Sequence, residues 1–422
     1  MSDCHTIAFS KVHSKGHKNF TSMTELRRYF VCYYHEIVLK RGNRDFFEKQ
    51  LHRNIEEALR GLRYGAIRQL SGRVVIELFS ESPIQEIGSR LTKVFGLAFC
   101  CPAWRSSQNM EQLARDLGEL VDKQTFKTFK IRSRRANKKF PLTSVQVNTL
   151  LGDVIRKRSG KSVDLDNPDL TCHVDIVEQQ VFLYFDRLKG SRGLPVSSSG
   201  KVVVLMSGGI DSPVAAYKVM KRGCRVIFAH FHSWPHTTRE SLDKVHQLVS
   251  ILSQHQYKSK LYMFPFAELQ KQIVAFTPAS TRIILYRRMM VRLAEKVARR
   301  ERAQALVTGD SIGQVSSQTL ENLRAVSDVS ELPILRPLIG EDKEEIVSVA
   351  RHIGTFATSI LPDVDCCSLF VPRHPEIRAK IPGIRRVEEQ LEVEQMVETT
   401  WRRVEVKTVV FQDELKVNLI NS

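Results

Sequence analysis

The chain has 422 residues, 42% of them hydrophobic and 26% charged, which is typical of a globular protein with two or three domains. Its 64 lysines and arginines outnumber its 46 acidic residues, and the net charge of +18 favours a polyanionic partner, nucleic acid first. A merely basic surface is the alternative that charge alone leaves open. No apolar run approaches the roughly 20 residues that span a bilayer, and no apolar signal segment stands at the start. We therefore expect a cytoplasmic protein without membrane contacts.

The cysteines are few for the length of the chain, which favours free thiols in a reducing compartment. No Cys-x-x-Cys pair is present, so the sequence gives little support to a zinc or iron–sulfur centre, and we expect no dedicated metal site. The eight cysteines are Cys4, Cys32, Cys100, Cys101, Cys172, Cys224, Cys366 and Cys367.

The N-terminal part of the chain predicts a small α+β domain. Residues 1–28 are polar and rich in histidine and lysine, and we expect a disordered extension there. Apolar residues at helical spacing over 45–62 precede a strand over 74–78. A helix over 84–94 and a strand over 98–102 complete a β-α-β-α-β order of ferredoxin-like type. We place this domain at 29–81.

A second module is expected over 82–187, followed by a linker over 188–200. Helices are predicted at 110–123 and 143–157, and two strands at 172–185. Between them, residues 126–139 hold seven basic residues and no acidic one. Phosphate contacts would position a nucleic acid here without reading its sequence. The candidate contacts are Lys127, Lys130, Arg132, Arg134, Arg135, Lys138 and Lys139.

The most informative stretch is a buried strand over 202–206 that runs into a glycine turn and a helix. Gly208 and Gly209 remove two Cβ atoms where a ligand could approach the backbone closely. Pro213 suits a first helical position, with Asp211 or Ser212 as the cap before it. The backbone N–H groups and the helix dipole then favour an anion at this turn.

Strands and helices alternate from residue 201 to 400, which predicts a doubly wound parallel sheet, with a tail over 401–422. In such sheets ligands bind at the carboxyl ends of the strands, here the loops after Met206, Phe231 and Thr308. The expected strands cover 226–231, 260–266 and 305–308, and the expected helices 214–222, 238–253, 282–300 and 343–353.

The glycine turn is not a Walker loop, because no Gly-Lys-Ser/Thr follows it. The run Ser207-Gly-Gly-Ile-Asp-Ser212 instead resembles the PP-loop of ATP pyrophosphatases, which adenylate a substrate oxygen and release pyrophosphate. An ordinary strand-turn-helix unit is the alternative for this motif taken alone.

Further motifs make the resemblance more specific. Leu205–Pro375 resembles the catalytic core of the tRNA uracil 4-sulfurtransferases, also called tRNA 4-thiouridine synthetases, and 82–187 resembles their tRNA-binding THUMP module. The matching runs are Ala229-His-Phe-His232, Arg287-Arg-Met-Met290, Thr308-Gly-Asp-Ser-Ile-Gly-Gln-Val-Ser-Ser-Gln-Thr-Leu-Glu-Asn322, Pro333-Ile-Leu-Arg-Pro-Leu-Ile339 and Ile360-Leu-Pro-Asp-Val-Asp-Cys-Cys-Ser-Leu-Phe-Val-Pro372. Asp310 stands where the family usually has glutamate.

The resemblance implies an ATP site. Asp211 would orient Mg²⁺ with ATP, since Mg²⁺ prefers carboxylate and phosphate oxygens, although a helix N-cap explains an aspartate equally well. Leu205, Met206 and Phe231 are alternatively core residues, and Arg287 alternatively belongs to a solvated helix face. The implied contacts are Leu205, Met206, Ser207, Gly208, Gly209, Asp211, Ser212, His230, Phe231, Arg287, Gly309 and Gln318.

Cys366 matches the cysteine that handles sulfur in the family, whereas buried packing is the alternative for it and for Cys367. Longer relatives append a rhodanese-like domain that carries the persulfide, for which this chain has no room after the catalytic domain. The resemblance therefore implies a separate sulfur donor, such as a cysteine desulfurase or a persulfide carrier. It leaves a homodimer open.

By this resemblance ATP adenylates O4 of uridine 8 in tRNA, and sulfur then displaces AMP to give 4-thiouridine. The same family supplies sulfur to the thiazole of thiamine. Another PP-loop enzyme that modifies tRNA, and a tRNA-binding protein without catalysis, are the alternatives.

Overall fold

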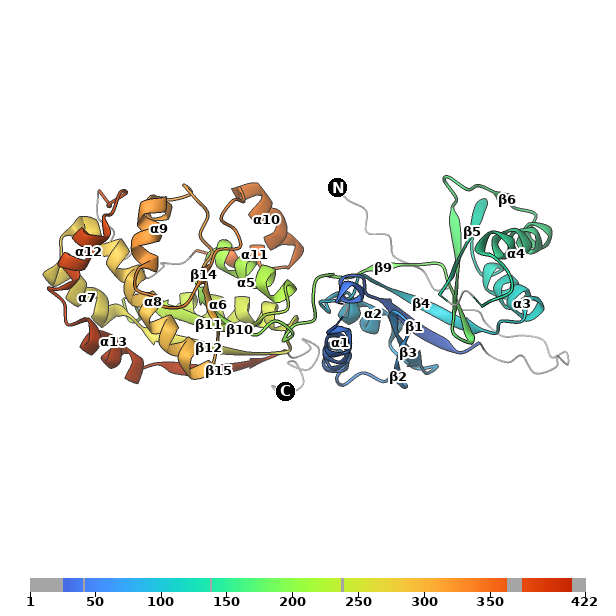
Figure 1. The fold of residues 1–422 in the computed structure, drawn as a ribbon, viewed down its shortest axis with the longest axis horizontal. Helices are drawn as coiled ribbons and strands as arrows, with labels where there is room; N and C mark the ends of the chain where they lie inside the picture. The colour runs from blue at the N-terminus through green and yellow to red at the C-terminus, as the bar shows by residue number, and fades with distance from the viewer. Residues whose placement is uncertain (1–25, 41, 137–138, 237–238, 363–373, 412–422) are drawn as a thin grey trace.

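The structure is a computed structural model that describes residues 26–40, 42–136, 139–236, 239–362 and 374–411. It has two halves joined end to end, an N-terminal half built on one mainly antiparallel sheet and a C-terminal α/β half (Figure 1). The elements of the N-terminal half, with η marking a 3-10 helix, are β1 (Arg28–Tyr33), η1 (Glu36–Leu39), α1 (Arg44–Ala58), β2 (Ile67–Leu70), β3 (Arg73–Leu78), α2 (Ile84–Thr92), β4 (Phe99–Ser106), α3 (Met110–Val121), β5 (Thr128–Arg135), α4 (Ser144–Ser159), β6 (Ser162–Val163), β7 (Leu170–Val177), β8 (Gln180–Tyr184) and β9 (Leu188–Lys189).

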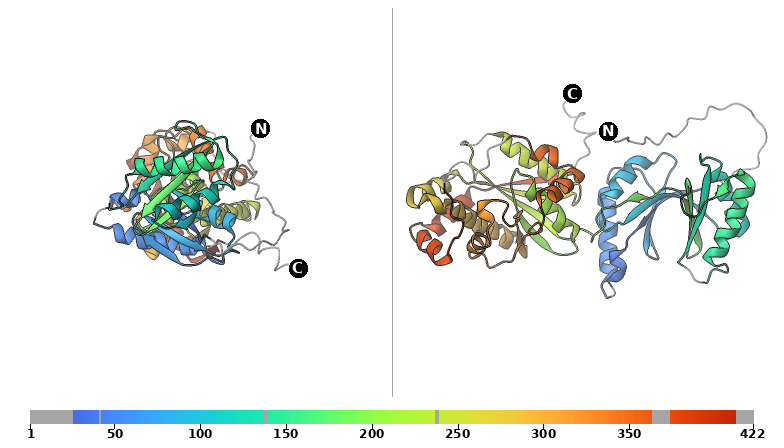
Figure 2. Two further views of the ribbon diagram at one scale, coloured as in Figure 1. Left: turned by 90° about the vertical axis from the view of Figure 1, so that its right-hand side faces the viewer. Right: turned by 90° about the horizontal axis from the view of Figure 1, so that it is seen from above.

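One continuous sheet joins the two predicted N-terminal modules. Its order is β2-β3-β1-β4-β8-β7-β5-β6, and β9 also pairs with β4. The long strand β4 connects the modules, because it pairs with β1 along most of its length and its second half also pairs with β8. The helices of the second module, α3 and α4, lie at the end of the molecule away from the C-terminal half (Figure 2).

Two of the expected boundaries differ in the structure. Ile87 and Leu91 of α2 share a core with Phe30 of β1, so 82–106 belongs largely to the first module and the boundary at 81 falls inside it. Leu26 packs against the core of the second module. The last residues of the expected 1–28 extension, from residue 26 on, therefore belong to the folded part of the protein. Residues 1–25 lie outside the described residues.

The expected linker at 188–200 is packed rather than loose. Leu194 and Val196 are buried, and the backbone N–H of Leu194 donates to the carbonyl of Lys221 in the C-terminal half. Phe95, from the loop after α2, inserts its ring into the core of the C-terminal half beside Tyr217 and His255. These contacts join the two halves.

The C-terminal half confirms the expected doubly wound fold. Its sheet has the order β14-β13-β10-β11-β12-β15, and all neighbouring strands are parallel except β12 and β15. Its elements are β10 (Lys201–Met206), α5 (Asp211–Lys221), β11 (Arg225–His232), α6 (Arg239–Ser253), β12 (Lys258–Pro265), α7 (Ala267–Phe276), η2 (Ala279–Thr281), α8 (Arg282–Glu301), β13 (Ala305–Val307), η3 (Ser316–Gln318), α9 (Leu320–Ser327), β14 (Ile334–Leu335), α10 (Lys343–His352), α11 (Phe356–Ser359), α12 (Ile381–Glu388), α13 (Val393–Arg402) and β15 (Glu405–Val410).

Strand β10 is covered on both faces, as its apolar run predicts. Val202 and Val204 face a core that includes α5, α6 and α10, whereas Val203 and Leu205 face α8 and its neighbours. Successive residues thus pack against opposite layers of helices (Figure 1). This buried central strand holds the glycine turn at its carboxyl end.

The expected tail over 401–422 is partly wrong. Residues Glu405–Val410 form the antiparallel edge strand β15, which pairs with β12. The sequence did not predict this strand, because most of its residues are exposed and only Val409 is buried. It therefore lacks the alternation of apolar and polar residues that indicates a strand. Over the ranges that the structure covers, no helix combines the length and apolar character that a bilayer span requires.

Candidate active site

The carboxyl ends of three parallel strands meet at the centre of the C-terminal sheet. Met206 of β10 lies in register with His230 of β11, and Val204 lies in register with Val307 of β13. The chain leaves β10 toward β11 on one side and returns to β13 on the other. A ligand crevice is expected at such a switch point.

Two serines hold the glycine turn after β10. The Oγ of Ser212 accepts a hydrogen bond from the backbone N–H of Ser207 at 2.9 Å, and the two hydroxyls lie 3.0 Å apart. Gly209 is exposed, and a Cβ built there would meet only the Ser207 hydroxyl, at 3.5 Å. The packing of this loop therefore does not require glycine at 209, whereas a ligand lying close against the loop would.

The helix cap differs from the expectation. Helix α5 begins at Asp211, with Ile210 at the cap position and no side chain bonding there, so neither Asp211 nor Ser212 is the N-cap. The Asp211 carboxylate instead accepts a bond from Nζ of Lys343 at 2.7 Å and from the amide of Gln314 at 3.2 Å. Its carboxylate is thus placed at the start of the helix without serving as its cap.

Lys343 is a site residue that sequence reasoning missed. It is the first residue of α10, whose capping box is formed by Asp342 and Glu345. A lysine beside an acidic cap resembles an ordinary solvated helix start, and no local pattern in the sequence connects it to Asp211. Its ammonium group nevertheless lies at the glycine turn, where it adds a positive charge.

Gly309 has a structural reason that the sequence did not reveal. A Cβ built on it would lie 2.8 Å from the backbone nitrogen of Ser212 and 2.9 Å from the carbonyl carbon of Asp211. Such distances to backbone atoms are too short for any side chain. The loop after β13 therefore packs directly against the start of α5, and glycine allows this close approach.

Arg287 is not on a solvated face, because it is largely buried and paired. One guanidinium nitrogen donates to the Asp310 carboxylate at 2.6 Å and another donates to the carbonyl of Ser317 at 2.9 Å. Asp310 also accepts bonds from the hydroxyl of Thr308 at 2.7 Å, the amide of Gln318 at 3.4 Å and the guanidinium of Arg336 at 3.4 Å. Asp310 thus binds two of the residues that were predicted to contact ATP, Arg287 and Gln318.

The electrostatics of this cluster favour a charged Asp310. Burial raises the pKa of its carboxyl, but the charges of Arg287 and Arg336, together with hydrogen bonds from Thr308 and Arg287, outweigh burial and bring that pKa below its ordinary value. One carboxylate between two guanidinium groups leaves one positive charge in excess. This surplus favours an anionic ligand at the carboxyl edge.

The remaining predicted contacts divide between backbone and core. Nδ1–H of His230 donates to the carbonyl of Met206 at 2.9 Å, which joins the ends of β10 and β11. Met206 is buried and Leu205 is half-buried. Phe231 is buried and stacks on Phe264 with ring centroids 5.1 Å apart, so its side chain packs in the core of the sheet.

The basic segment of the second module forms β5, whose residues alternate between two faces. Phe129 and Ile131 pack into the core with α4, whereas Lys130, Arg132 and Arg134 lie on the opposite face. Of the other predicted contacts, Lys127 and Lys139 are exposed, Arg135 is half-buried, and Lys138 lies outside the described residues.

A pocket of about 360 Å³ lies beside this basic face, at the junction of the two N-terminal modules. Tyr33 and Tyr34, the buried Arg73 and the exposed Arg134 are among its lining residues. The Arg73 side chain is 1% exposed and pairs with the equally buried Asp175 at 3.1 Å. The pocket therefore joins basic groups from both modules.

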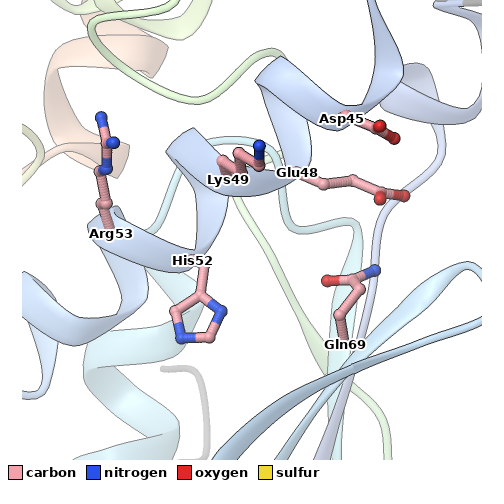
Figure 3. Close-up of a pocket in the computed structure, with 6 residues that line it drawn as sticks. All are labelled: Asp45, Glu48, Lys49, His52, Arg53 and Gln69. Carbon is pink, nitrogen blue, oxygen red and sulfur yellow. The ribbon is translucent and has the colours of Figure 1, made fainter.

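A second pocket lies against α1, whose side chains line it together with Gln69 of β2 (Figure 3). Its lining is of mixed charge, and none of the motifs described above falls on it, so we assign it no role. The lining residues are Asp45, Glu48, Lys49, His52, Arg53 and Gln69.

The described cysteines are poorly suited to sulfur chemistry. Cys32, Cys100, Cys101 and Cys172 are buried and Cys224 is half-buried. Burial raises the pKa of the Cys172 thiol to about 12 and raises that of Cys101 further, so both stay protonated near neutral pH. Cys366 and Cys367 lie outside the described residues, in the gap between Leu361–Pro362 and His374.

The parallel sheet, the Ser207–Ser212 turn and the charged cluster at its carboxyl edge define an α/β nucleotide-binding fold of the PP-loop class. Models of three families match successive parts of the chain: the ThiI ferredoxin-like domain at 29–101, the THUMP domain at 107–186, and the thiamine biosynthesis protein (ThiI) at 197–393. The chain belongs to the ThiI family.

Curated relatives cover nearly the whole chain. A probable tRNA sulfurtransferase of Thermus thermophilus is 41% identical over 381 residues, which are 90% of this chain and 93% of the relative. One from Moorella thermoacetica is 40% identical over 377 residues, covering 89% and 96% respectively. The relatedness therefore includes all three parts of the chain and not the catalytic half alone.

Solved structures agree with this assignment. A 4-thiouridine synthetase in complex with RNA and bound ATP superposes with a TM-score of 0.82 at 34% identity, covering 91% of this chain and all of that one. A Pyrococcus horikoshii protein, PH1313, gives a TM-score of 0.61 at 25% identity, covering 78% of this chain and 99% of that one.

Proposed function

We propose that this protein is an ATP-dependent tRNA sulfurtransferase that converts uridine 8 of tRNA to 4-thiouridine. The observation that carries the proposal is the junction of the Ser207–Ser212 turn with the Asp211–Lys343 pair and the Arg287–Asp310 cluster at one sheet edge. A solved relative that matches nearly the whole chain is a 4-thiouridine synthetase with RNA and ATP. The thiamine role of the family belongs to the same proposal.

The first step transfers AMP to the base. The backbone of the glycine turn and the start of α5 would hold the phosphates of ATP, because N–H groups and the helix dipole favour an anion there. O4 of the uridine attacks the α-phosphorus and the bond to pyrophosphate breaks. The Lys343 ammonium and the surplus positive charge around Asp310 would stabilise the negative charge on the phosphates.

Asp211 fits a role as a magnesium ligand. Its carboxylate lies at the anion-binding end of α5, where it would repel phosphate unless a cation lies between them. Mg²⁺ typically combines one or two carboxylates with phosphate oxygens and water, which a single Asp211 satisfies. Mg²⁺ would shield the phosphate charge when bound, while Lys343 and Gln314 hold the carboxylate in place.

In the second step a sulfur nucleophile attacks C4 of the adenylated base, and AMP leaves with the former O4. We assign sulfur handling to Cys366. The protonated state of the buried thiols supports this assignment, and so does the anchoring of the chain before it. The Ser359 hydroxyl donates to the carbonyl of Gly209 at 3.3 Å, and Nζ of Lys244 donates to the carbonyl of Leu361 at 2.7 Å.

The N-terminal half would bind tRNA. The exposed basic face of β5 and the pocket beside it, lined by Arg73 and Arg134, suit the phosphates and sugars of an RNA strand. The sulfur would come from a separate donor such as a cysteine desulfurase or persulfide carrier, and a homodimer and a cytoplasmic location belong to the same proposal.

The products of the nucleotide reaction test the proposal. Purified protein, tRNA transcript, Mg-ATP and sulfide should give pyrophosphate and AMP in amounts that match the 4-thiouridine formed. Release of ADP and phosphate, or no tRNA-dependent turnover, would exclude it. Thiolation with AMP formation at another uridine would favour another PP-loop enzyme that modifies tRNA.

A further inference from the structure

Two arginines share the single buried carboxylate of Asp310, and they are held in different ways. The side chain of Asp310 is 7% exposed, and those of Arg287 and Arg336 are 15% and 17% exposed. The family resemblance implies a contact between Arg287 and ATP, whereas it implies none for Arg336.

Arg336 is anchored by parts of the fold that frame the site. It follows β14 directly, and its guanidinium donates to the hydroxyl of Ser327, the last residue of α9, at 2.7 Å. A second bond reaches the carbonyl of Ile334 in β14 at 3.4 Å. These two bonds would hold Arg336 in place whether or not the other arginine moves.

Arg287 is held by groups at the crevice itself. Its two bonds go to Asp310 and to the carbonyl of Ser317 in the short helix η3. The residues before η3, from Ile312 to Val315, are exposed. Of the two arginines, Arg287 is thus the one that can turn toward a ligand at the strand ends.

A buried carboxylate that loses its only charged partner is strongly destabilised, because its desolvation is no longer compensated. If Arg287 turned from Asp310 to a phosphate with no second arginine present, Asp310 would keep only neutral donors. With Arg336 in place, Asp310 retains an opposite charge after Arg287 leaves.

We propose that Arg336 is a positioning residue that keeps Asp310 neutralised while Arg287 moves from Asp310 to the phosphates of ATP. This inference rests on the proposed function, because it requires ATP at this edge of the sheet. It assigns the Asp310–Arg336 pair to nucleotide binding and leaves RNA binding unaffected.

Calorimetric titration of the full-length protein with Mg-ATP, without tRNA, tests the exchange through affinity alone. Arg336→Gln should weaken ATP binding at least about tenfold, because Arg287 is then held on Asp310. Arg336→Lys, which keeps the charge, should bind within about threefold of the unmodified protein. Arg299→Gln is the matched control, since Arg299 lies on the same helix as Arg287 but is exposed and pairs with Glu295 and Glu331.

The double variant Asp310→Asn/Arg336→Gln separates this exchange from a purely structural role. Without the carboxylate, Arg287 is free to reach the phosphates, so the double variant should bind ATP within about threefold of the unmodified protein. The effects of the two substitutions on ATP affinity would then not be additive. Unchanged affinity in Arg336→Gln, or an equal or greater loss in the double variant, would overturn the inference.

Thermal melting would show whether Arg336→Gln folds. If it does not, the same test can be made by comparing Asp310→Asn with Asp310→Asn/Arg336→Gln. We expect the two variants to bind ATP with equal affinity. A weaker affinity in the double variant would contradict the exchange. If the unmodified protein failed to bind ATP, the proposed function itself would fail.

Discussion

At the scale of single residues, the site depends on close backbone contacts and on shared charges. Gly309 lets the loop after β13 contact the start of α5. At the strand ends, Asp211 pairs with the side chain of Lys343 and Asp310 pairs with that of Arg287. Ser207 and Asp211 could be selected from the sequence because they lie in a run that resembles a known loop, and Arg287 because it lies in a second run that resembles the same family. Lys343 and Arg336 could not, since each reaches its partner only through the tertiary fold.

Gly309→Ala should damage the site through the backbone. The added Cβ would meet the backbone of Asp211 and Ser212 below 3.0 Å, so the glycine turn must shift. We expect a stability loss of about 1–3 kcal/mol and at least about tenfold weaker ATP binding. Gly340→Ala is the matched control, because a Cβ at that position would have no neighbouring atom within 4 Å. ATP titration and denaturant unfolding measure both effects, and normal ATP binding by Gly309→Ala would contradict the role of this close approach.

Asp211 and Lys343 should act together in adenylation. Asp211→Ala should abolish tRNA-dependent pyrophosphate release and leave the affinity for tRNA nearly unchanged, because the proposed RNA face lies in the other half. Lys343→Gln should slow pyrophosphate release by about 10²-fold or more, the usual effect of removing a charge that stabilises a transition state. A pyrophosphate assay with excess tRNA measures both, and a fully active Lys343→Gln would remove this residue from the site.

At the scale of elements, the sequence predicted best where burial is uniform. The apolar run of β10 and the periodic pattern of α8 predicted the sheet and its long helix nearly at their observed bounds. Short or exposed elements were missed, including β2, β14 and β15, because too few of their residues are buried to create a pattern. The packed 188–200 segment was missed because Gly, Ser and Pro also occur where chains pack closely.

The junction of the two halves should loosen in acid. His255 is buried between Phe95 and Tyr217, its Nδ1–H donates to the carbonyl of Lys93 at 3.1 Å, and burial lowers its pKa to about 4. The unfolded chain, with a pKa near 6.5, takes up the proton first, so stability falls as the pH drops from about 6.5 to 4.

Replacing His255 should flatten that dependence. Between pH 7.5 and pH 5, the free energy of unfolding should fall by about 2 kcal/mol because of His255 alone. In His255→Phe this part of the decrease should be absent. Urea unfolding at both pH values measures it. His232 lies outside the junction, and burial also lowers its pKa to about 4. The variant His232→Phe therefore provides a comparison, which shows whether the loosening of the junction in acid depends specifically on His255, the histidine that packs on Phe95. An equally steep pH dependence in His255→Phe would contradict this explanation.

At the scale of the whole molecule, one half supplies the proposed RNA surface and the other supplies the nucleotide site. The net charge of +18 predicted a polyanionic partner, and the alternation of β5 places three basic side chains on one face, where Arg132 and Arg134 are exposed and Lys130 is half-buried. The sequence could not show that β4 joins the two N-terminal modules into one sheet, because that pairing connects residues far apart in the chain.

Binding of tRNA should depend strongly on salt and on β5. Replacing Lys130, Arg132 and Arg134 with glutamine should weaken tRNA binding and reduce the slope of log affinity against log salt by about 0.7–0.9 for each phosphate that is no longer neutralised. Affinity for ATP should stay unchanged. Arg156 on the exposed side of α4 provides a control, and filter binding at several salt concentrations measures the slopes. A tRNA affinity insensitive to salt would contradict the proposed surface.

The most direct test of the proposed reaction is mass analysis of nucleosides from tRNA incubated with the protein, Mg-ATP and a persulfide donor. We predict 4-thiouridine at position 8, formed together with AMP and pyrophosphate. We also predict no product from Asp211→Ala, and none from Cys366→Ser with that donor. Absence of 4-thiouridine with the unmodified protein, or its formation without ATP, would contradict the central claim.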